Sequence, residues 1–271
     1  MNLQPIKSEN NPKFKNALRL HSSRGRKQQD RIIIFGLQEI SRACQAGVTV
    51  LEVFVDENQA PPDCLATVEG AAFYQLPSSL FNKLAFGDRN DGVVVVAQRP
   101  ESGLAALNLS PDALVVVLQG IEKPGNVGAV FRSADGAGAD AVLLADPLTD
   151  AFHPNSIRAS LGAVFSMPTV SVDSRSLQEY LHQQRFQILA ACLDTEQDYY
   201  SIDLKRRTAL VLGNEKQGLS DDWRGSGILS FQLPMRGQVD SLNVSSTAAI
   251  LVYEAMRQRH DGIDSSEKND L

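Results

Sequence analysis

Three polar stretches in the second half of the chain combine glycines with residue types that could hold a small ligand. They are GIEKPGNVG (120–128), LGNEKQGLS (212–220) and LPMRGQVDSLN (233–243). Each follows an apolar run that is typical of a buried strand. In an open parallel sheet, ligands bind at the carboxyl ends of the strands, so these stretches are expected to meet at one edge.

The usual nucleotide fingerprints do not fit these glycines. Gly120 and Gly125 have the spacing of a phosphate loop, but Asn126 and Val127 stand where Lys and Ser or Thr are required. The pair Gly136 and Gly138 follows a helix and lacks a third glycine. Nucleotide hydrolysis and nicotinamide-dependent oxidation are therefore disfavoured. The four histidines are scattered and no HExxH motif occurs, so no metal site is expected.

Several polar side chains in these stretches could take part in chemistry. Asn126 is expected at a helix start, with Arg132 almost two turns along. Glu215, between two glycines, could pair with Arg132 and fix its guanidinium in a bidentate geometry. Asn243 lies where a buried helix is expected to begin. The first backbone N–H groups of that helix need acceptors, and the side-chain oxygen of Asn243 can supply one. The plain alternative is a solvated surface arginine beside ordinary strand–helix connections.

The elements that must position these residues form a two-domain chain. Residues 1–12 are expected to be a disordered tail, 13–98 a small α/β domain, 99–112 a linker, and 261–271 a second disordered tail. The larger domain spans 113–260, with strands at 113–119, 141–145, 187–193 and 208–213. Its helices are expected at 127–136, 156–163, 175–185 and 243–259.

Charge is distributed unevenly along the 271 residues. The formal net charge is −6, yet residues 1–31 carry eight Lys or Arg and two acidic residues. This basic arm includes Arg24, Arg26, Lys27 and Arg31 and could follow a phosphate backbone. No apolar run is long enough to cross a bilayer, and no signal peptide is indicated. The three widely spaced cysteines favour a reducing, cytoplasmic location.

Taken together, three segments resemble the SpoU/TrmH family of RNA ribose 2′-O-methyltransferases. NVGAVFRSADGAGAD (126–140), LVLGNEKQGLS (210–220) and LPMRGQVDSLNVSSTAAILVYE (233–254) match its three motifs in order and spacing. DAFHPNSIRASLGAVFSMPTV (150–170) resembles the segment that joins the first two motifs. The first domain is similar, more loosely, to a ribosomal-protein-like substrate-binding domain, with Phe35-Gly36 where that family commonly has Glu-Gly.

The resemblance implies a SPOUT-type fold, in which a mostly parallel sheet carries helices on both faces and a trefoil knot near the C-terminus. It also implies bound S-adenosylmethionine and a homodimer with the site near the subunit interface. The residue patterns described above predict neither a metal nor a membrane as partner. The cofactor-binding positions that it implies are Leu212, Gly213, Asn214, Gly218, Leu233, Met235, Leu242 and Asn243. The catalytic positions that it implies are Asn126, Arg132, Glu215, Ser241 and Asn243, and RNA contacts are expected at Arg24, Arg26, Lys27, Arg31, Asn155 and Arg158.

The reaction implied is attack of a ribose 2′-hydroxyl on the sulfonium methyl group. Because arginine stays protonated, Arg132 is expected to orient a phosphate and stabilise charge on the 2′-oxygen instead of removing the proton. Glu215 would hold Arg132. Ribosomal RNA is favoured over transfer RNA as the substrate. Two alternatives stay open: a non-catalytic RNA-binding protein with this fold, and a base-modifying SPOUT methyltransferase.

Overall fold

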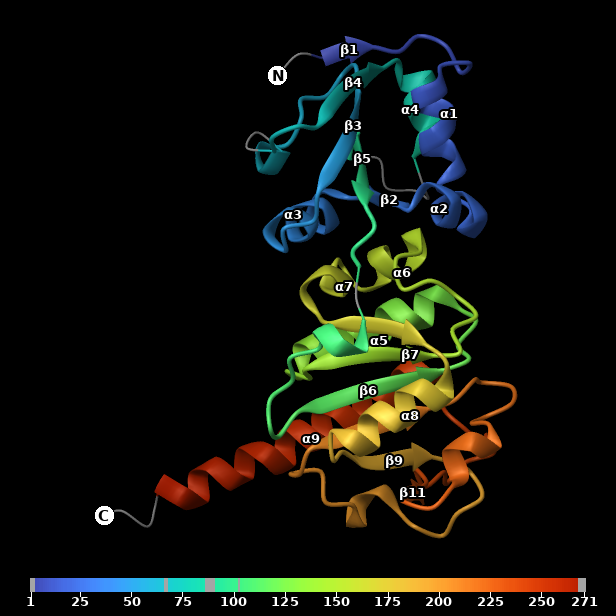
Figure 1. Ribbon diagram of the computed structural model, residues 1–271, viewed down its shortest axis with the longest axis vertical. Coiled ribbons are helices and arrows are strands. Elements are labelled where there is room, and N and C mark those ends of the chain that lie inside the picture. Colours follow the sequence, from blue (N-terminus) through green and yellow to red (C-terminus); the bar gives the residue numbers. More distant parts are fainter. Residues whose placement is uncertain (1–2, 66–67, 86–90, 102, 268–271) are drawn as a thin grey trace. The chain divides into compact units, whose positions relative to one another are not determined.

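The computed structural model describes residues 3–65, 68–85, 91–101 and 103–267, which form two compact units (Figure 1). The first unit comprises Met1–Glu101 and Asp150–Ser166, and the second comprises Ser102–Thr149 and Met167–Leu271. The sequence had placed 150–166 inside the larger domain, whereas in the structure this segment packs with the first unit. Within the described residues, no helix has the length and apolar character that crossing a membrane needs.

The first unit is a mixed five-stranded sheet with helices. Its strands, β1 (Leu3–Pro5), β2 (Arg31–Phe35), β3 (Val50–Asp56), β4 (Ala72–Leu76) and β5 (Val93–Gln98), are ordered β1-β4-β3-β5-β2. Its helices are α1 (Pro12–Arg19), α2 (Ser23–Gln29), α3 (Leu37–Gln45), α4 (Ser78–Leu84), α6 (Pro154–Ala159) and α7 (Ala163–Ser166), with a 3-10 turn, η1, at Asp63–Leu65. Phe14 of α1 and Phe81 of α4 pack with Phe54 of β3 in one buried core.

Part of the predicted N-terminal tail is folded, which corrects the expectation of disorder over 1–12. β1 pairs in parallel with β4, with Leu3 opposite Phe73, and Ile6 is buried. The partner strand lies about seventy positions away in the sequence, so this pairing left no local signal in a short polar segment. At the other end, α9 (Val244–Glu267) runs into the predicted second tail, and residues 268–271 lie outside the described part of the chain.

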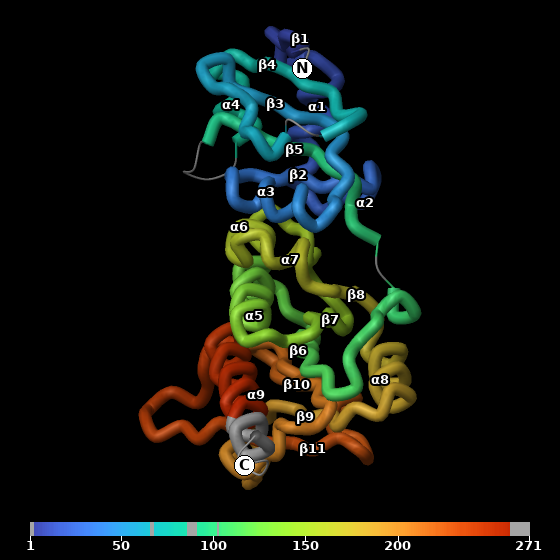
Figure 2. The backbone as a smooth tube through the Cα atoms, turned by 90° about the vertical axis from the view of Figure 1, so that its left-hand side faces the viewer, coloured from blue at the N-terminus to red at the C-terminus, as the bar shows by residue number. Residues whose placement is uncertain are grey.

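The second unit is a six-stranded parallel sheet. Its strands, β6 (Leu114–Gln119), β7 (Ala141–Ala145), β8 (Thr169–Val172), β9 (Gln187–Ala191), β10 (Thr208–Leu212) and β11 (Ile228–Phe231), are ordered β11-β9-β10-β6-β7-β8. α5 (Pro124–Gly136) and α9 pack together on one face, and α8 (Ser174–Gln183) covers the other, as Figure 2 shows. The short 3-10 turns are η2 (Leu104–Ala106), η3 (Tyr199–Ser201) and η4 (Asp221–Arg224). The predicted α/β fold with a parallel sheet is confirmed.

Apolar runs explain why this sheet forms. β6 and β10 are buried on both faces, as strands of a parallel sheet between two helical layers must be. Trp223 of η4 is fully buried beneath α8, where its Nε1 donates to Ser174 Oγ at 3.0 Å. Because all the strands are parallel, the loops after β6, β9, β10 and β11 emerge at one edge. This edge carries the residues predicted to be catalytic and is called the catalytic edge below.

Candidate active site

A cavity of about 300 Å³ opens at the catalytic edge of the second unit. Seven of the eight predicted cofactor-binding residues line it: Leu212, Gly213, Asn214, Gly218, Leu233, Met235 and Leu242. Ser241, predicted to be catalytic, lines it as well, while Asn243 does not. Its walls combine apolar side chains with the backbone of two glycine-containing loops, which suits an apolar ligand with polar ends.

The cavity also has lining residues that the sequence reasoning missed. Ala191, Cys192, Leu193 and Asp194 come from the end of β9, and Arg224 and Thr247 line other parts. Arg224 forms an ion pair with Asp194, and its hydrogen bond holds the pKa of that carboxyl below the ordinary value. β9 was predicted as a strand, so the rule that ligands bind at strand carboxyl ends could have pointed to 191–194.

Close packing of the backbone shapes the loop at 212–220, which follows β10. A Cβ built on Gly213 would lie 2.4 Å from the carbonyl carbon of Gly218 and 2.5 Å from Leu219 N. Gly218 itself has a φ of +70°, which favours glycine. Asn214 joins this loop to the loop at 120–128 after β6, because its Nδ2 donates to the carbonyl of Gly120 at 2.8 Å. The loop therefore has one shape that a side chain at 213 would disturb.

Glu215 is the centre of a polar cluster that joins all three loops. Lys123, at the N-cap position of α5, donates from Nζ to Glu215 Oε2 at 2.7 Å. Asn243 Nδ2 donates to Glu215 Oε1 at 2.8 Å, and Asn126 Nδ2 donates to the same oxygen. The hydrogen bond to Glu215 and the charge of that carboxylate raise the pKa of Lys123. Three predicted catalytic residues are thus brought together.

Arg132 stands apart from this cluster, so the predicted Glu215–Arg132 ion pair is wrong. Both carboxylate oxygens of Glu215 accept hydrogen bonds, from Lys123, Asn126 and Asn243, and no ion pair joins Glu215 to Arg132 among the described residues. Arg132 is exposed on α5, and no hydrogen bond or ion pair holds its guanidinium within the described residues. Lys123 was not predicted, although its position three residues before Asn126 was visible in the sequence.

The predicted RNA-binding residues all lie in the first unit, and the prediction is wrong for one of them, Arg26. Arg24 and Lys27 are exposed on α2, Arg31 is half-buried with Nη1 3.8 Å from Glu52, and Arg158 is half-buried on α6. Arg26 is 0% exposed, which corrects its assignment to an RNA-contacting surface. A short helix of seven residues gives too little periodicity to tell a buried arginine from an exposed one.

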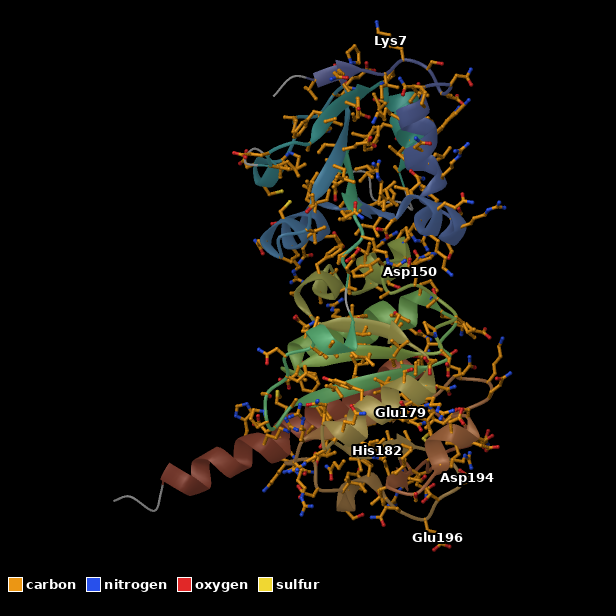
Figure 3. The ribbon with its side chains drawn as sticks, in the orientation of Figure 1. Lys7, Asp150, Glu179, His182, Asp194 and Glu196 are labelled. Atoms are coloured by element: carbon orange, nitrogen blue, oxygen red, sulfur yellow. The ribbon has the colours of Figure 1, made fainter. Side chains whose placement is uncertain are left out.

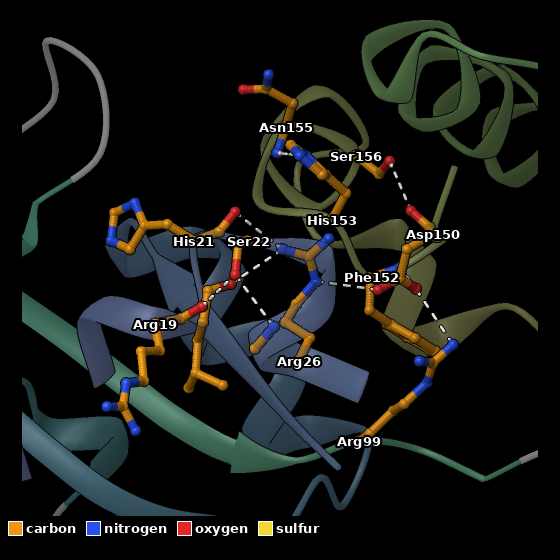
Figure 4. A network of polar contacts seen from close by, with 12 residues as sticks. Arg19, His21, Ser22, Arg26, Arg99, Asp150, Phe152, His153, Asn155 and Ser156 are labelled. Carbon is orange, nitrogen blue, oxygen red and sulfur yellow. Dashed lines mark hydrogen bonds and ion pairs between the residues drawn. The ribbon is translucent and has the colours of Figure 1, made fainter. Parts of the chain in front are cut away.

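Arg26 is held inside the first unit by Asp150 and by backbone carbonyls (Figure 4). Its Nε donates to Asp150 Oδ2 at 3.0 Å, and Nη1 donates to the carbonyls of Leu20 and His21 at 2.9 and 3.1 Å. Asp150 also accepts from Arg99 Nη2 at 3.3 Å. Arg26 therefore fastens the segment 150–166 to the first unit. These contacts compensate Nε and Nη1, while Nη2 is buried without a hydrogen-bond partner among the described residues.

Comparison with known proteins follows the same division of the chain. The model of the SpoU rRNA Methylase family matches residues 113–253, more than half of the chain. The chain belongs to this family. Within this SpoU family protein, residues 11–95 match a second model, the MRM3-like substrate binding domain.

Individual relatives of this SpoU family protein match along nearly their full length. The 23S rRNA (guanosine(2553)-2′-O)-methyltransferase RlmP of Bacillus subtilis is 30% identical, covering 93% of this chain and 98% of its own. A crystal structure of an RNA 2′-O ribose methyltransferase is 38% identical, with a TM-score of 0.82 over 94% of this chain and 99% of its own. The AdoMet-bound rRNA methyltransferase from Sinorhizobium meliloti has a TM-score of 0.86 and 26% identity, with coverage of 94% and 98%.

Proposed function

We propose that this protein transfers a methyl group from S-adenosylmethionine to a ribose 2′-hydroxyl of ribosomal RNA. The observation that carries the proposal is the joining of Asn126, Glu215 and Asn243 beside the cavity at one sheet edge. Two of the relatives named above, RlmP and the Sinorhizobium meliloti protein, are rRNA methyltransferases by name, which favours ribosomal RNA over transfer RNA. A pure RNA-binding protein would not need these residues together beside a ligand-sized cavity, which argues against the non-catalytic alternative.

The residues of the cavity fit S-adenosylmethionine. Leu212, Leu233, Met235 and Leu242 offer apolar surface for an adenosine moiety. The turn between Gly213 and Gly218, closed by backbone hydrogen bonds between Asn214 and Gly218, lets the backbone line the cavity beside it. Asp194, Asp240 and Ser241 supply polar groups for the amino-acid end and the cationic sulfonium. When bound, the cofactor supplies a methyl group that is already activated, so the main tasks of the protein are alignment and charge stabilisation.

We assign separate roles to the polar residues. Glu215, fixed by Lys123, holds the side-chain amides of Asn126 and Asn243 in place beside the cavity. Asn126, Asn243 and Ser241 position the target nucleotide and the methionine end of the cofactor. Arg132, with no partner among the described residues, is free to bind the target phosphate and to stabilise the 2′-oxygen as its proton leaves.

The first unit is proposed to bind the RNA substrate, in keeping with the family model that matches 11–95. Arg24 and Lys27 on α2, together with Arg31 and Arg158, are the proposed phosphate contacts. The domain limits 13–98, 99–112 and 113–260 are kept as the proposed functional division, although 150–166 packs with the first unit. Free thiols at Cys44, Cys64 and Cys192 are compatible with the expected cytoplasmic location.

We further propose that the second unit dimerises and that its C-terminal segment forms the trefoil knot. Ile250 and Tyr253 are 37% and 47% exposed on α9, where large apolar side chains favour a partner surface. Gly136 of α5 lies beside Tyr253, because a Cβ there would be 3.1 Å from Tyr253 Oη. One observation supports the knot. After the chain has formed the loops that line the cavity, α9 packs against α5, which lies much earlier in the sequence. A crystal structure with bound cofactor would test the threading.

Replacing Tyr253 with glutamate is expected to convert the dimer to a monomer. A charge placed at the centre of an apolar interface leaves an unpaired carboxylate to desolvate, which costs several kcal/mol. Sedimentation velocity measures the change, and Arg175→Glu on the exposed side of α8 is the control. A variant that sediments as the wild-type protein does would show that this face is not the dimer interface.

Replacing Gly213 with alanine is expected to weaken S-adenosylmethionine binding at least about tenfold and to lower kcat/KM by about 10². The new Cβ would collide with the backbone of Gly218 and Leu219, so the loop that carries Asn214 and Glu215 must move. Calorimetry measures the affinity. Gly125→Ala is the matched control, because a Cβ there meets nothing within 4 Å. Unchanged cofactor affinity in the Gly213 variant would contradict the proposed cofactor site.

The function itself is tested by methyl transfer from radiolabelled S-adenosylmethionine to RNA from a host that lacks this gene. Nuclease digestion and nucleoside analysis then locate the label. A labelled 2′-O-methylnucleoside in 23S-sized RNA is the expected result. Label on a base would instead support a base-modifying enzyme of the same fold. Failure of both methyl transfer and cofactor binding would leave the RNA-binding alternative.

A further inference from the structure

A second charged surface lies at the opposite edge of the parallel sheet, where the strands begin. Arg185 precedes β9, and Lys205, Arg206 and Arg207 precede β10. Gln187 N donates to Arg207 O at 2.9 Å and Gln187 pairs with Thr208, so the two segments lie side by side. These four residues are called the basic edge. Figure 3 marks the two ends of β9: His182 shortly before it and Asp194 shortly after it, on the catalytic edge.

The loop that carries the basic edge is held in one shape by α9. Gln258 accepts from Leu204 N at 2.9 Å and donates to the carbonyl of Ile202 at 3.1 Å. Arg259 donates to three carbonyls, those of Leu204, Asp112 and Arg206, at 2.9 Å each. The backbone at 202–206 is therefore fixed by α9 side chains, and the side chains of Lys205 and Arg206 are left exposed.

Most of the charge on this edge is not compensated within the described residues. Arg206 pairs with Asp203 at 3.2 Å, but Arg185, Lys205 and Arg207 form no side-chain hydrogen bond or ion pair there. Asp112 and Asp140 lie on the same edge. Burial lowers the pKa of Arg259, and the charges of these two carboxylates partly oppose that shift. On the catalytic edge, Lys123, Lys216 and Arg224 are each paired with a carboxylate, while Arg236 after β11 is exposed and forms no ion pair within the described residues.

Arg207 is positioned by an aromatic ring instead of by a carboxylate. Its guanidinium carbon lies 4.4 Å from the centre of the Phe186 ring, a cation–π geometry. Its Nε is buried and has no hydrogen-bond partner among the described residues. A neutral ring holds the guanidinium in place without cancelling its charge. The arrangement suits an arginine that must meet an external anion in a fixed orientation.

We propose that the basic edge is a contact surface for the sugar–phosphate backbone of the RNA substrate. The second unit carries 13 Lys and Arg residues against 20 Asp and Glu residues, so an RNA bound to it needs local positive surface to offset repulsion. The cations are spread over two segments, which fits a polyanion better than one small phosphate. The five residues of β10 put this surface roughly 17 Å from the catalytic edge, so it anchors the RNA away from the target ribose.

This inference rests on the proposed function, and its test can fail separately. The variant is Arg185→Gln with Lys205→Gln. The control is Arg175→Gln with Lys83→Gln, which removes two exposed cations that each pair with a carboxylate elsewhere. The probe is an unmethylated 23S ribosomal RNA transcript, with binding measured over a series of salt concentrations. Calorimetry with S-adenosylmethionine and sedimentation accompany each protein.

The plot of log Kobs against log salt has a negative slope. Loss of two phosphate contacts is expected to reduce the magnitude of this slope by about 1.5. KM for the RNA should rise about fivefold or more near 0.1 M salt, with kcat and cofactor affinity unchanged. The same slope in the variant, control and wild-type proteins would overturn the proposal, as would a change of oligomeric state in the variant alone. Wild-type protein that binds RNA but transfers no methyl group would contradict the proposed function, while the slopes still decide the basic edge.

Discussion

Arg132→Ala is expected to lower kcat for methyl transfer by about 10² to 10³ and to leave the affinity for S-adenosylmethionine within about twofold. The guanidinium is exposed and unpaired within the described residues, so its removal disturbs no contact in the free protein. Its contribution arises when negative charge develops on the 2′-oxygen beside a phosphate. Because arginine stays protonated at all relevant pH values, the effect comes from lost charge stabilisation and not from a lost base.

Single-turnover methyl transfer with saturating RNA measures this effect, and calorimetry measures cofactor binding. Arg175→Ala is the matched control, since Arg175 is an exposed arginine of the same unit and pairs with Glu179. Arg132→Lys separates charge from shape: it should recover part of the rate if a point charge suffices. Wild-type turnover in Arg132→Ala would remove Arg132 from the mechanism and direct attention to Lys123, the other cation beside Glu215.

The parallel sheet and the site loops could be predicted because their signals are local. The apolar runs of β6 and β10 indicate strands buried on both faces, and the glycines after them mark loops at one edge. These two signals predicted that the three loops meet at one edge, and in the structure Asn126, Glu215 and Asn243 of those loops are joined by hydrogen bonds.

Partner choice among charged groups was much harder to predict. A carboxylate at 215 can bind any nearby donor, and the sequence does not say that Lys123 and two amides reach it before Arg132 does. Burial of Arg26 was equally hidden, because its compensating group, Asp150, is more than a hundred residues away. Ion pairing depends on tertiary contacts, so it leaves no periodic pattern in the sequence.

The Arg26–Asp150 pair is expected to give the largest effect on stability. Asp150→Ala removes the carboxylate and leaves the fully buried guanidinium uncompensated at Nε, which should destabilise the first unit by about 3 to 5 kcal/mol. Arg26→Met with Asp150→Leu removes both charges and should cost less than the single change, since no charge is then left buried. By contrast, removing the exposed Arg175–Glu179 pair should cost under about 1 kcal/mol.

Hydrogen exchange read peptide by peptide locates the effect as well as measuring it. Asp150 lies in the stretch that the sequence assigned to the catalytic domain, yet its contacts are with α2 and with Arg99 of the first unit. Faster exchange in Asp150→Ala is therefore expected in β2, β5 and α6, while β6, β9 and β10 keep wild-type protection. Loss of protection in the second unit instead would mean that 150–166 stabilises the parallel sheet, and Arg26 would then have no role in fastening this segment to the first unit.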